Sequence, residues 1–122
     1  NIKEIELKLI ECFAILKSGG KLIGRVPSGD SPFSLSIQNG DMTHKSSLGS
    51  SMIRQLAMAI GFEVEVIRSP SLPIMGLGIK TLFRRLIIRI VRRLSYPFVI
   101  NIFMGGGKLV LTPNLLFVLK KP

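Results

Sequence analysis

Gly40-Asp41-Met42-Thr43-His44 opens the stretch that decides the fold of this chain, and the segment after it ends at Ala59-Ile60-Gly61-Phe62. Apolar residues recur in that segment every three or four positions, which predicts a helix that begins at residue 49 or 50. Gly61 ends the helix, because glycine adopts the left-handed conformation of a helix C-terminus at little cost. Apolar and acidic side chains then alternate over residues 62–67, which predicts a strand with one dry and one solvated face.

A second helix and strand precede this stretch. Apolar residues from Ile2 to Leu16 follow the helical spacing, and Gly19-Gly20 ends that helix. Lys21–Val26 is then a short strand that ends at Pro27. Residues 28–49 are rich in Ser, Gly, Asp and Asn and form a long loop, and loops of that length inside a domain usually have a function.

The downstream part consists of a helix and a final strand. A helix is expected from about Ile79 to Tyr96, and Pro97 is expected to stop it because proline lacks the N–H that a helix interior needs. Val99–Met104 is expected to continue as a second short helix or a strand, and Asn114–Leu119 is expected to be the last strand. Helices and strands that alternate in this way indicate an α/β fold.

Several of these segments resemble the back half of an S-adenosylmethionine (SAM)-dependent methyltransferase of the Rossmann-like class, within the bacterial small-molecule methyltransferase group. The similarity covers roughly residues 1–69 and 111–122 and is carried by the following motifs: Leu16-Lys17-Ser18-Gly19-Gly20, Val26-Pro27, Gly40–His44, Ala59–Phe62, Leu111-Thr112-Pro113-Asn114-Leu115 and Lys120-Lys121-Pro122. Two positions depart from the family pattern. Ser28 stands where the family has Asn, and Gly49 stands where it usually has a helix-capping Thr.

The resemblance implies a C-terminal half of the methyltransferase fold, with about three strands, flanking helices and a helical insertion. The last strand would lie between the other two and antiparallel to them. The chain would be a single partial domain, in which residues 1–73 form the main unit, 74–107 a basic helical insertion and 108–122 the final strand. We expect the strand Lys21–Val26 to lack its inner neighbour and to promote self-association along this edge.

SAM is the cofactor that the resemblance implies for a full-length enzyme. Such a cofactor needs a Gly-rich turn between a strand and a helix, and an acidic residue for its ribose. The 122 residues contain no strand–Gly-x-Gly–helix unit, since Gly19-Gly20 follows a helix and Gly105–Gly107 precedes a strand. We therefore expect the fragment alone to be inactive and unable to bind SAM. Its role would be to supply the acceptor-side wall and lid of a small-molecule methyl-transfer site.

Asp41, Thr43 and His44 are the candidate catalytic residues. A methyl acceptor often loses a proton to a base, and His44 in a long loop beyond a strand suits that task, with Asp41 beside it. The alternative interpretation is structural: Asp41 would accept backbone N–H bonds, and His44 would pack before the helix.

Positive charge is concentrated in one segment. Residues 1–70 hold eight Lys/Arg and seven Asp/Glu, whereas residues 71–122 hold nine Lys/Arg and no acid. In the helix that begins at Ile79, Arg85, Arg89 and Arg92 are candidates to bind a phosphate-bearing acceptor, because guanidinium groups form paired bonds with phosphate oxygens. Three alternatives remain. The helix has an ordinary solvated face, or the chain is a stand-alone basic module in which the Arg84–Arg93 helix binds an anionic membrane surface or a phosphate-bearing partner. The third alternative is a small basic nucleic-acid-binding protein.

Composition excludes several other functions. With one Cys (Cys12) and one His (His44) the chain cannot form a zinc cluster from these side chains, and Cys12 fits an apolar helix face. No Trp and one Tyr leave few stacking platforms, so nucleic-acid binding is not expected. No apolar run is long enough to cross a bilayer, and residues 1–16 carry three Glu and do not resemble a signal peptide. We expect a cytoplasmic protein, with peripheral membrane contact as the alternative.

Overall fold

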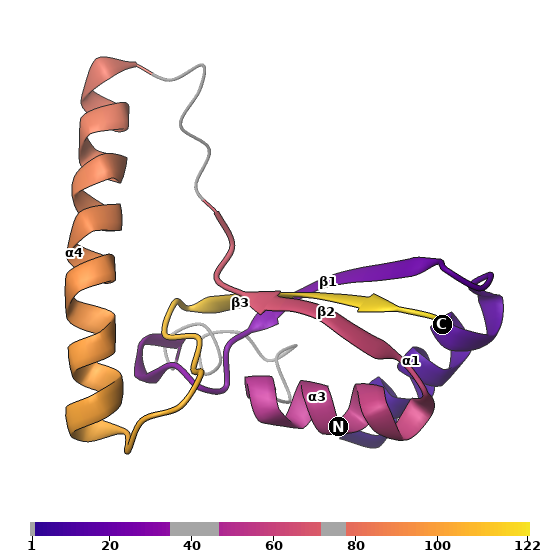
Figure 1. The fold of residues 1–122 in the computed structure, drawn as a ribbon. Coiled ribbons are helices and arrows are strands. Elements are labelled where there is room, and N and C mark those ends of the chain that lie inside the picture. Colours follow the sequence, from indigo (N-terminus) through magenta and orange to yellow (C-terminus); the bar gives the residue numbers. More distant parts are fainter. Residues whose placement is uncertain (1, 35–46, 72–77) are drawn as a thin grey trace. The chain divides into compact units, whose positions relative to one another are not determined.

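The computed structural model describes residues 2–34, 47–71 and 78–122. Helices and strands alternate along these residues (Figure 1). The elements are α1 (Ile2–Ile15), β1 (Lys21–Pro27), the short 3-10 helix η1 (Pro32–Ser34), α3 (Ser50–Ile60), β2 (Glu63–Arg68), α4 (Ile79–Phe103) and β3 (Asn114–Lys120). They belong to two compact units: Asn1–Pro70 with Val110–Pro122 form the sheet unit, and Ser71–Leu109 form the α4 unit.

The sheet has three strands in the order β1-β3-β2, and β3 is antiparallel to both neighbours. This arrangement confirms the α/β fold that the sequence pattern predicted and the central, antiparallel last strand that the resemblance implied. Leu115, Phe117 and Leu119 are buried on β3, while the residues between them are half-buried, because a central strand has neighbours along both edges. Among the described strands β1 pairs with β3 alone, so its other edge has no strand partner there.

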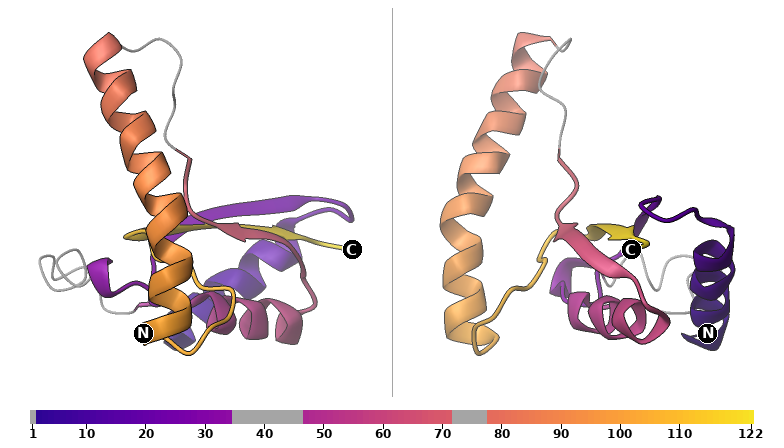
Figure 2. Two further views of the ribbon diagram at one scale, coloured as in Figure 1. Left: turned by 60° about the vertical axis from the view of Figure 1, so that its left-hand side comes forward. Right: turned by 45° about the vertical axis from the view of Figure 1, so that its right-hand side comes forward.

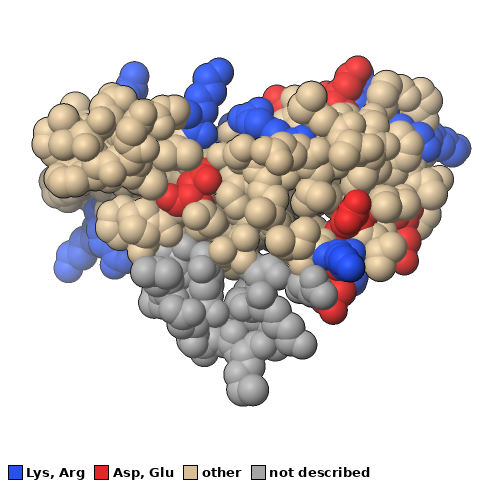
Figure 3. Space-filling view, turned by 90° about the horizontal axis from the view of Figure 1, so that it is seen from below, with Lys and Arg blue, Asp and Glu red and all other residues tan. Residues whose placement is uncertain are grey.

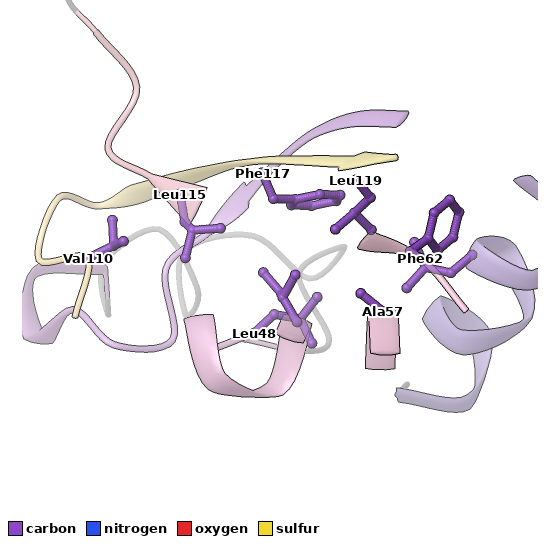
Figure 4. Close-up of a cluster of buried hydrophobic side chains, with 9 residues drawn as sticks. Leu48, Ala57, Phe62, Val110, Leu115, Phe117 and Leu119 are labelled. Carbon is purple, nitrogen blue, oxygen red and sulfur yellow. The ribbon is translucent and has the colours of Figure 1, made fainter. Parts of the chain in front are cut away.

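The core lies between the sheet and two helices on one of its faces. Figures 1 and 2 show α1 and α3 on the same side of the sheet. Leu115 and Leu119 both point from β3 towards the side of the sheet on which α3 lies, and Ala57 of α3 and Phe62 lie close to Leu119 (Figure 4). Phe62 also meets Phe13 of α1 edge to face, with ring centroids 4.9 Å apart. Removing these side chains from water is the main favourable term in folding the sheet unit.

Lys121 connects the end of β3 to the end of α1. Its Nζ donates to the carbonyl oxygens of Phe13 (2.7 Å) and Leu16 (2.9 Å), and it lies 4.5 Å from the centroid of the Phe13 ring. The last turn of α1 carries no basic residue of its own. A cation at a helix C-terminus is favourable because the unpaired carbonyls there carry partial negative charge. Lys121 therefore supplies the charge that α1 lacks.

Two elements differ from the sequence prediction. The helix α4 does not stop at Pro97 but continues to Phe103, so residues 99–103 are its last turns rather than a separate element. Proline costs one hydrogen bond and a local clash, but its fixed φ is helical, and the helix resumes after it. The strand β2 begins at Glu63, one residue later than expected, and a bulge between Val64 and Val66 interrupts its alternation.

The helix α4 has no buried side chain. None of the described helices combines the length and the apolar character needed to cross a bilayer.

Replacing Lys121 tests its role at the end of α1. We expect Lys121→Met to lower the free energy of unfolding by about 1–2 kcal/mol, because two carbonyls lose a charged donor. The matched control, Lys17→Met, changes an exposed lysine just after α1. It should change the free energy of unfolding by less than about 0.5 kcal/mol. Urea denaturation followed by circular dichroism measures both. Equal effects of the two substitutions would contradict the capping role.

Candidate functional site

A turn of small polar residues, Ser28–Ser31, follows β1 at its carboxyl end. Ser28 is fully buried; its N–H donates to the Pro113 carbonyl (2.9 Å) and its Oγ donates to the Val110 carbonyl (2.6 Å). Ser31 is also buried, and its Oγ donates to the Leu111 carbonyl (2.5 Å). The turn is thus bonded to the segment that leads into β3. A hydroxyl that reaches a backbone carbonyl suits this buried position, because an unpaired buried carbonyl is costly.

The far end of the long loop returns to the same turn. Ser28 and Leu48 form a parallel bridge, and the Gly29 N–H donates to the Leu48 carbonyl at 2.9 Å. A Cβ on Gly29 would lie 2.6 Å from the backbone nitrogen of Gly49, so only glycine allows this close approach. Both ends of the segment that contains Asp41 and His44 are therefore held together at the carboxyl end of β1.

Asp30 is the residue on which this junction converges. Both of its carboxylate oxygens accept from the Ser50 N–H at 3.2 Å, and Oδ2 also accepts from the Val110 N–H at 3.2 Å. Ser50 is the first residue of α3, and Gly49, at the N-cap position, makes no side-chain cap. A carboxylate is favourable there, because the unpaired N–H groups of a helix N-terminus carry partial positive charge. Asp30 thus caps α3 from a distant point of the sequence.

Gly49 is explained by the same contact. A Cβ at this position would lie 2.8 Å from Asp30 Oδ1, so a side chain at the N-cap and the Asp30 carboxylate compete for one space. The absence of a capping side chain at Gly49 therefore leaves the helix capped, because another residue supplies the acceptor. Ser28, the other position at which the sequence departs from the pattern that it resembles, bonds to the Val110 carbonyl.

The hydrogen bonds described at this junction hold backbone segments together. The hydroxyls of Ser28 and Ser31 donate to carbonyls, and the Asp30 carboxylate accepts from amides. Over residues 2–34, 47–71 and 78–122 no group of three or more His, Cys, Asp or Glu is placed to hold a metal ion. The described residues therefore provide the support for a loop.

The predicted catalytic residues Asp41 and His44, with Thr43, lie outside the described residues, so their role stays a prediction. Arg85, Arg89 and Arg92 lie on α4, where a spacing of four and then three residues places them on one side of the helix. Their role as phosphate ligands likewise stays a prediction. Cys12 is half-buried on α1, as its position on an apolar face suggested.

Asp30 was missed by the sequence analysis. The one available signal was indirect: a helix whose N-cap is Gly49 has no capping side chain of its own and needs an acceptor from elsewhere.

Comparison with solved structures relates this fold to a known class. The crystal structure of a SAM dependent methyltransferase from Archaeoglobus fulgidus superposes on 99% of this chain with a TM-score of 0.58 and 16% sequence identity. The fold is methyltransferase-like. The chain spans about half of that protein, 53% of its length. No protein-family model matches the chain, and no curated protein matches it. At 16% identity the likeness concerns the fold alone.

Exchanging the cap between two positions tests this junction. Asp30→Ala should lower the free energy of unfolding by about 1–2 kcal/mol, because the first turn of α3 and the Val110 N–H lose an acceptor. Gly49→Thr should destabilise the wild type by crowding Asp30. In the Asp30→Ala background, however, Gly49→Thr should restore part of the lost free energy of unfolding. The Asp30 carboxylate no longer occupies the space beside position 49, so the Thr side chain fits and can cap α3 itself. Thermal or urea unfolding of the four proteins measures this coupling, and strictly additive effects would refute the shared space.

Proposed function

We propose that this chain is the acceptor-side portion of a SAM-dependent methyltransferase, of the kind that modifies small molecules. The observation that carries the proposal is the superposition of 99% of the chain on part of a methyltransferase structure. The strand order β1-β3-β2, with an antiparallel central strand, is the feature of the sheet that supports it. Fold alone does not specify activity, so the proposal also rests on the loop that is anchored beside the end of β1.

The cofactor does not fit the described residues of this chain. SAM, when bound, provides a methyl group on a positively charged sulfur, and enzymes of this fold hold it against a Gly-rich turn that opens a helix. Gly105, Gly106 and Gly107 all have positive φ, but the residues that follow them lead into β3 and not into a helix. Gly19 follows a helix and not a strand, and its N–H donates to the Lys121 carbonyl. We infer that the SAM site belongs to a part of the enzyme that pairs with the other edge of β1.

The acceptor side is the contribution that we assign to this chain. The Ser28–Asp30 turn and Leu48–Ser50 hold the ends of the loop that carries Asp41 and His44. In this proposal the loop forms one wall of the acceptor site and His44 receives the acceptor's proton, with Asp41 next to it. Arg85, Arg89 and Arg92 would hold a phosphate on the acceptor. Comparing turnover of a phosphate-bearing and a neutral acceptor by the whole enzyme tests that last assignment.

Titration with the cofactor tests the proposed division of labour. We expect no binding of SAM or S-adenosylhomocysteine to the 122-residue chain in isothermal calorimetry. The polypeptide extended by the genomic sequence upstream of Asn1 should bind in the micromolar range, about −8 kcal/mol. Micromolar binding by the short chain would mean that the cofactor site was misplaced. An upstream sequence without an in-frame Gly-rich strand–turn–helix would refute the methyltransferase assignment and favour a stand-alone basic module.

The open edge of β1 yields an independent expectation. Ile23, at the middle of this strand, is 67% exposed. An unpaired strand attracts another, so the short chain should self-associate as its concentration rises. Ile23→Lys should weaken this association, because a charge on an edge strand opposes pairing, whereas Met58→Lys on the exposed side of α3 should not. Light scattering over a concentration series measures it, and a stable monomer throughout would count against the proposal.

A further inference from the structure

The helix α4 carries a stripe of large apolar side chains that are exposed. Phe83, Leu86, Ile87, Ile90, Val91 and Leu94 recur at the helical spacing and form what we call the apolar stripe. Their exposed fractions run from 38% for Leu86 to 74% for Leu94, and Phe98 continues the stripe at 60%. An amphipathic helix usually buries such a face, so an exposed stripe of this length indicates a binding surface.

Positive charges border the stripe on both sides. At 3.6 residues per turn, Arg84 lies at one edge of the stripe and Arg93 at the opposite edge, while Arg85, Arg89 and Arg92 lie on the far side. Together with Lys80 the helix holds six cations and no acidic residue. The partner must therefore be apolar where it meets the stripe and negatively charged along both edges.

Neither a second copy of the helix nor the sheet unit meets this requirement. Two copies of α4 would bring six cations towards six cations, which repel one another. The sheet unit, Asn1–Pro70 with Val110–Pro122, has ten cations against seven anions and so no excess of negative charge. On the face shown in Figure 3, acidic side chains lie interspersed with basic ones and form no broad acidic area. A surface of anionic lipids combines an apolar interior with negative headgroups and fits both features of the helix.

The length of α4 suits a helix that lies in the plane of such a surface. Its 25 residues extend about 37 Å. The arginines along it prevent it from spanning the bilayer, in agreement with the lack of a membrane-spanning candidate among the described helices. Long arginine side chains at the edges of an apolar face can extend to the headgroups while their methylene groups stay in the apolar layer.

We propose that α4 binds an anionic membrane surface, with the apolar stripe at the acyl boundary and Arg84 and Arg93 at the lipid headgroups. The proposal does not depend on methyl transfer, because it rests on the exposure and charge of one helix. It would bring an attached enzyme to acceptors located at the membrane.

Sedimentation with lipid vesicles tests the proposal on the 122-residue chain. We expect binding to vesicles of phosphatidylcholine with about 30% phosphatidylglycerol, and much weaker binding to phosphatidylcholine alone. Raising the salt concentration should weaken binding, because it screens the attraction of the arginines to the headgroups. Equal binding to both vesicles, or none to either, would overturn the proposal.

Substitutions separate the contribution of the stripe from that of the charges. Arg84→Gln with Arg93→Gln should reduce the partition coefficient about 25-fold, or about fivefold for each arginine. Its control is Lys8→Gln with Lys17→Gln, which removes two exposed charges from the N-terminal segment and should leave binding almost unchanged. Leu86→Gln with Ile90→Gln and Leu94→Gln should reduce binding more than about 100-fold. The control for that variant is Ile15→Gln with Met58→Gln, two exposed apolar residues outside α4.

Fluorescence distinguishes lipid insertion from association between protein copies. The chain has no Trp, so Phe83→Trp places a single indole in the stripe, and Phe33→Trp places one at an exposed site outside α4. We expect a blue shift with anionic vesicles for Trp at position 83 and none at position 33. A blue shift at position 83 that depends on protein concentration without vesicles would show that a second copy covers the stripe, and the proposal would be wrong.

Discussion

The position of β3 between β1 and β2 is the constraint on which the sheet unit depends. Its buried side chains Leu115 and Leu119 provide the middle of the core, and each of its edges supplies hydrogen bonds to a neighbour that would otherwise have none in this sheet. The residues on either side of β3 extend its influence, because Val110 and Leu111 bind the turn after β1 and Lys121 caps α1. Since β3 follows the α4 segment in the sequence, the sheet unit is completed by residues that are distant in sequence from β1 and β2.

The segment before β3 also positions the ends of the candidate acceptor loop. Asp30 receives one amide from α3 and one from the segment before β3, so a single carboxylate connects three parts of the chain. The residues at the two ends of the loop that carries Asp41 and His44 are thereby attached to the end of the sheet. Binding and catalytic residues commonly lie on long loops of this kind, because the scaffold fixes where the loop begins and ends. The methyltransferase-like fold and this anchored loop are the two observations behind the acceptor-side role that we propose.

The helix α4 has a different physical character from the sheet unit. It contains six basic residues and no acidic one, whereas basic and acidic residues nearly balance in residues 1–70. Its large apolar side chains are exposed rather than buried. An insertion with these properties contributes little to the core of a domain, and its composition suits an interaction with an anionic apolar surface. Two functions that need different chemistry, acceptor binding and membrane attachment, would then reside in separate parts of one chain.

The helical spacing before Gly19, the glycine stop at Gly61 and the alternation of the last strand determined the α/β fold from sequence, because each depends on residues close together in the chain. The central place of β3 came from a resemblance and not from local pattern. Only the tertiary structure decided the cap of α3 by Asp30 and the cap of α1 by Lys121, since these partners are 20 and more than 100 residues apart. It also decided that α4 continues through Pro97, because proline removes one bond while the turns on either side keep theirs. The local spacing of apolar residues and glycines specifies where helices and strands form. Long-range hydrogen bonds and packing specify which distant residues cap those helices.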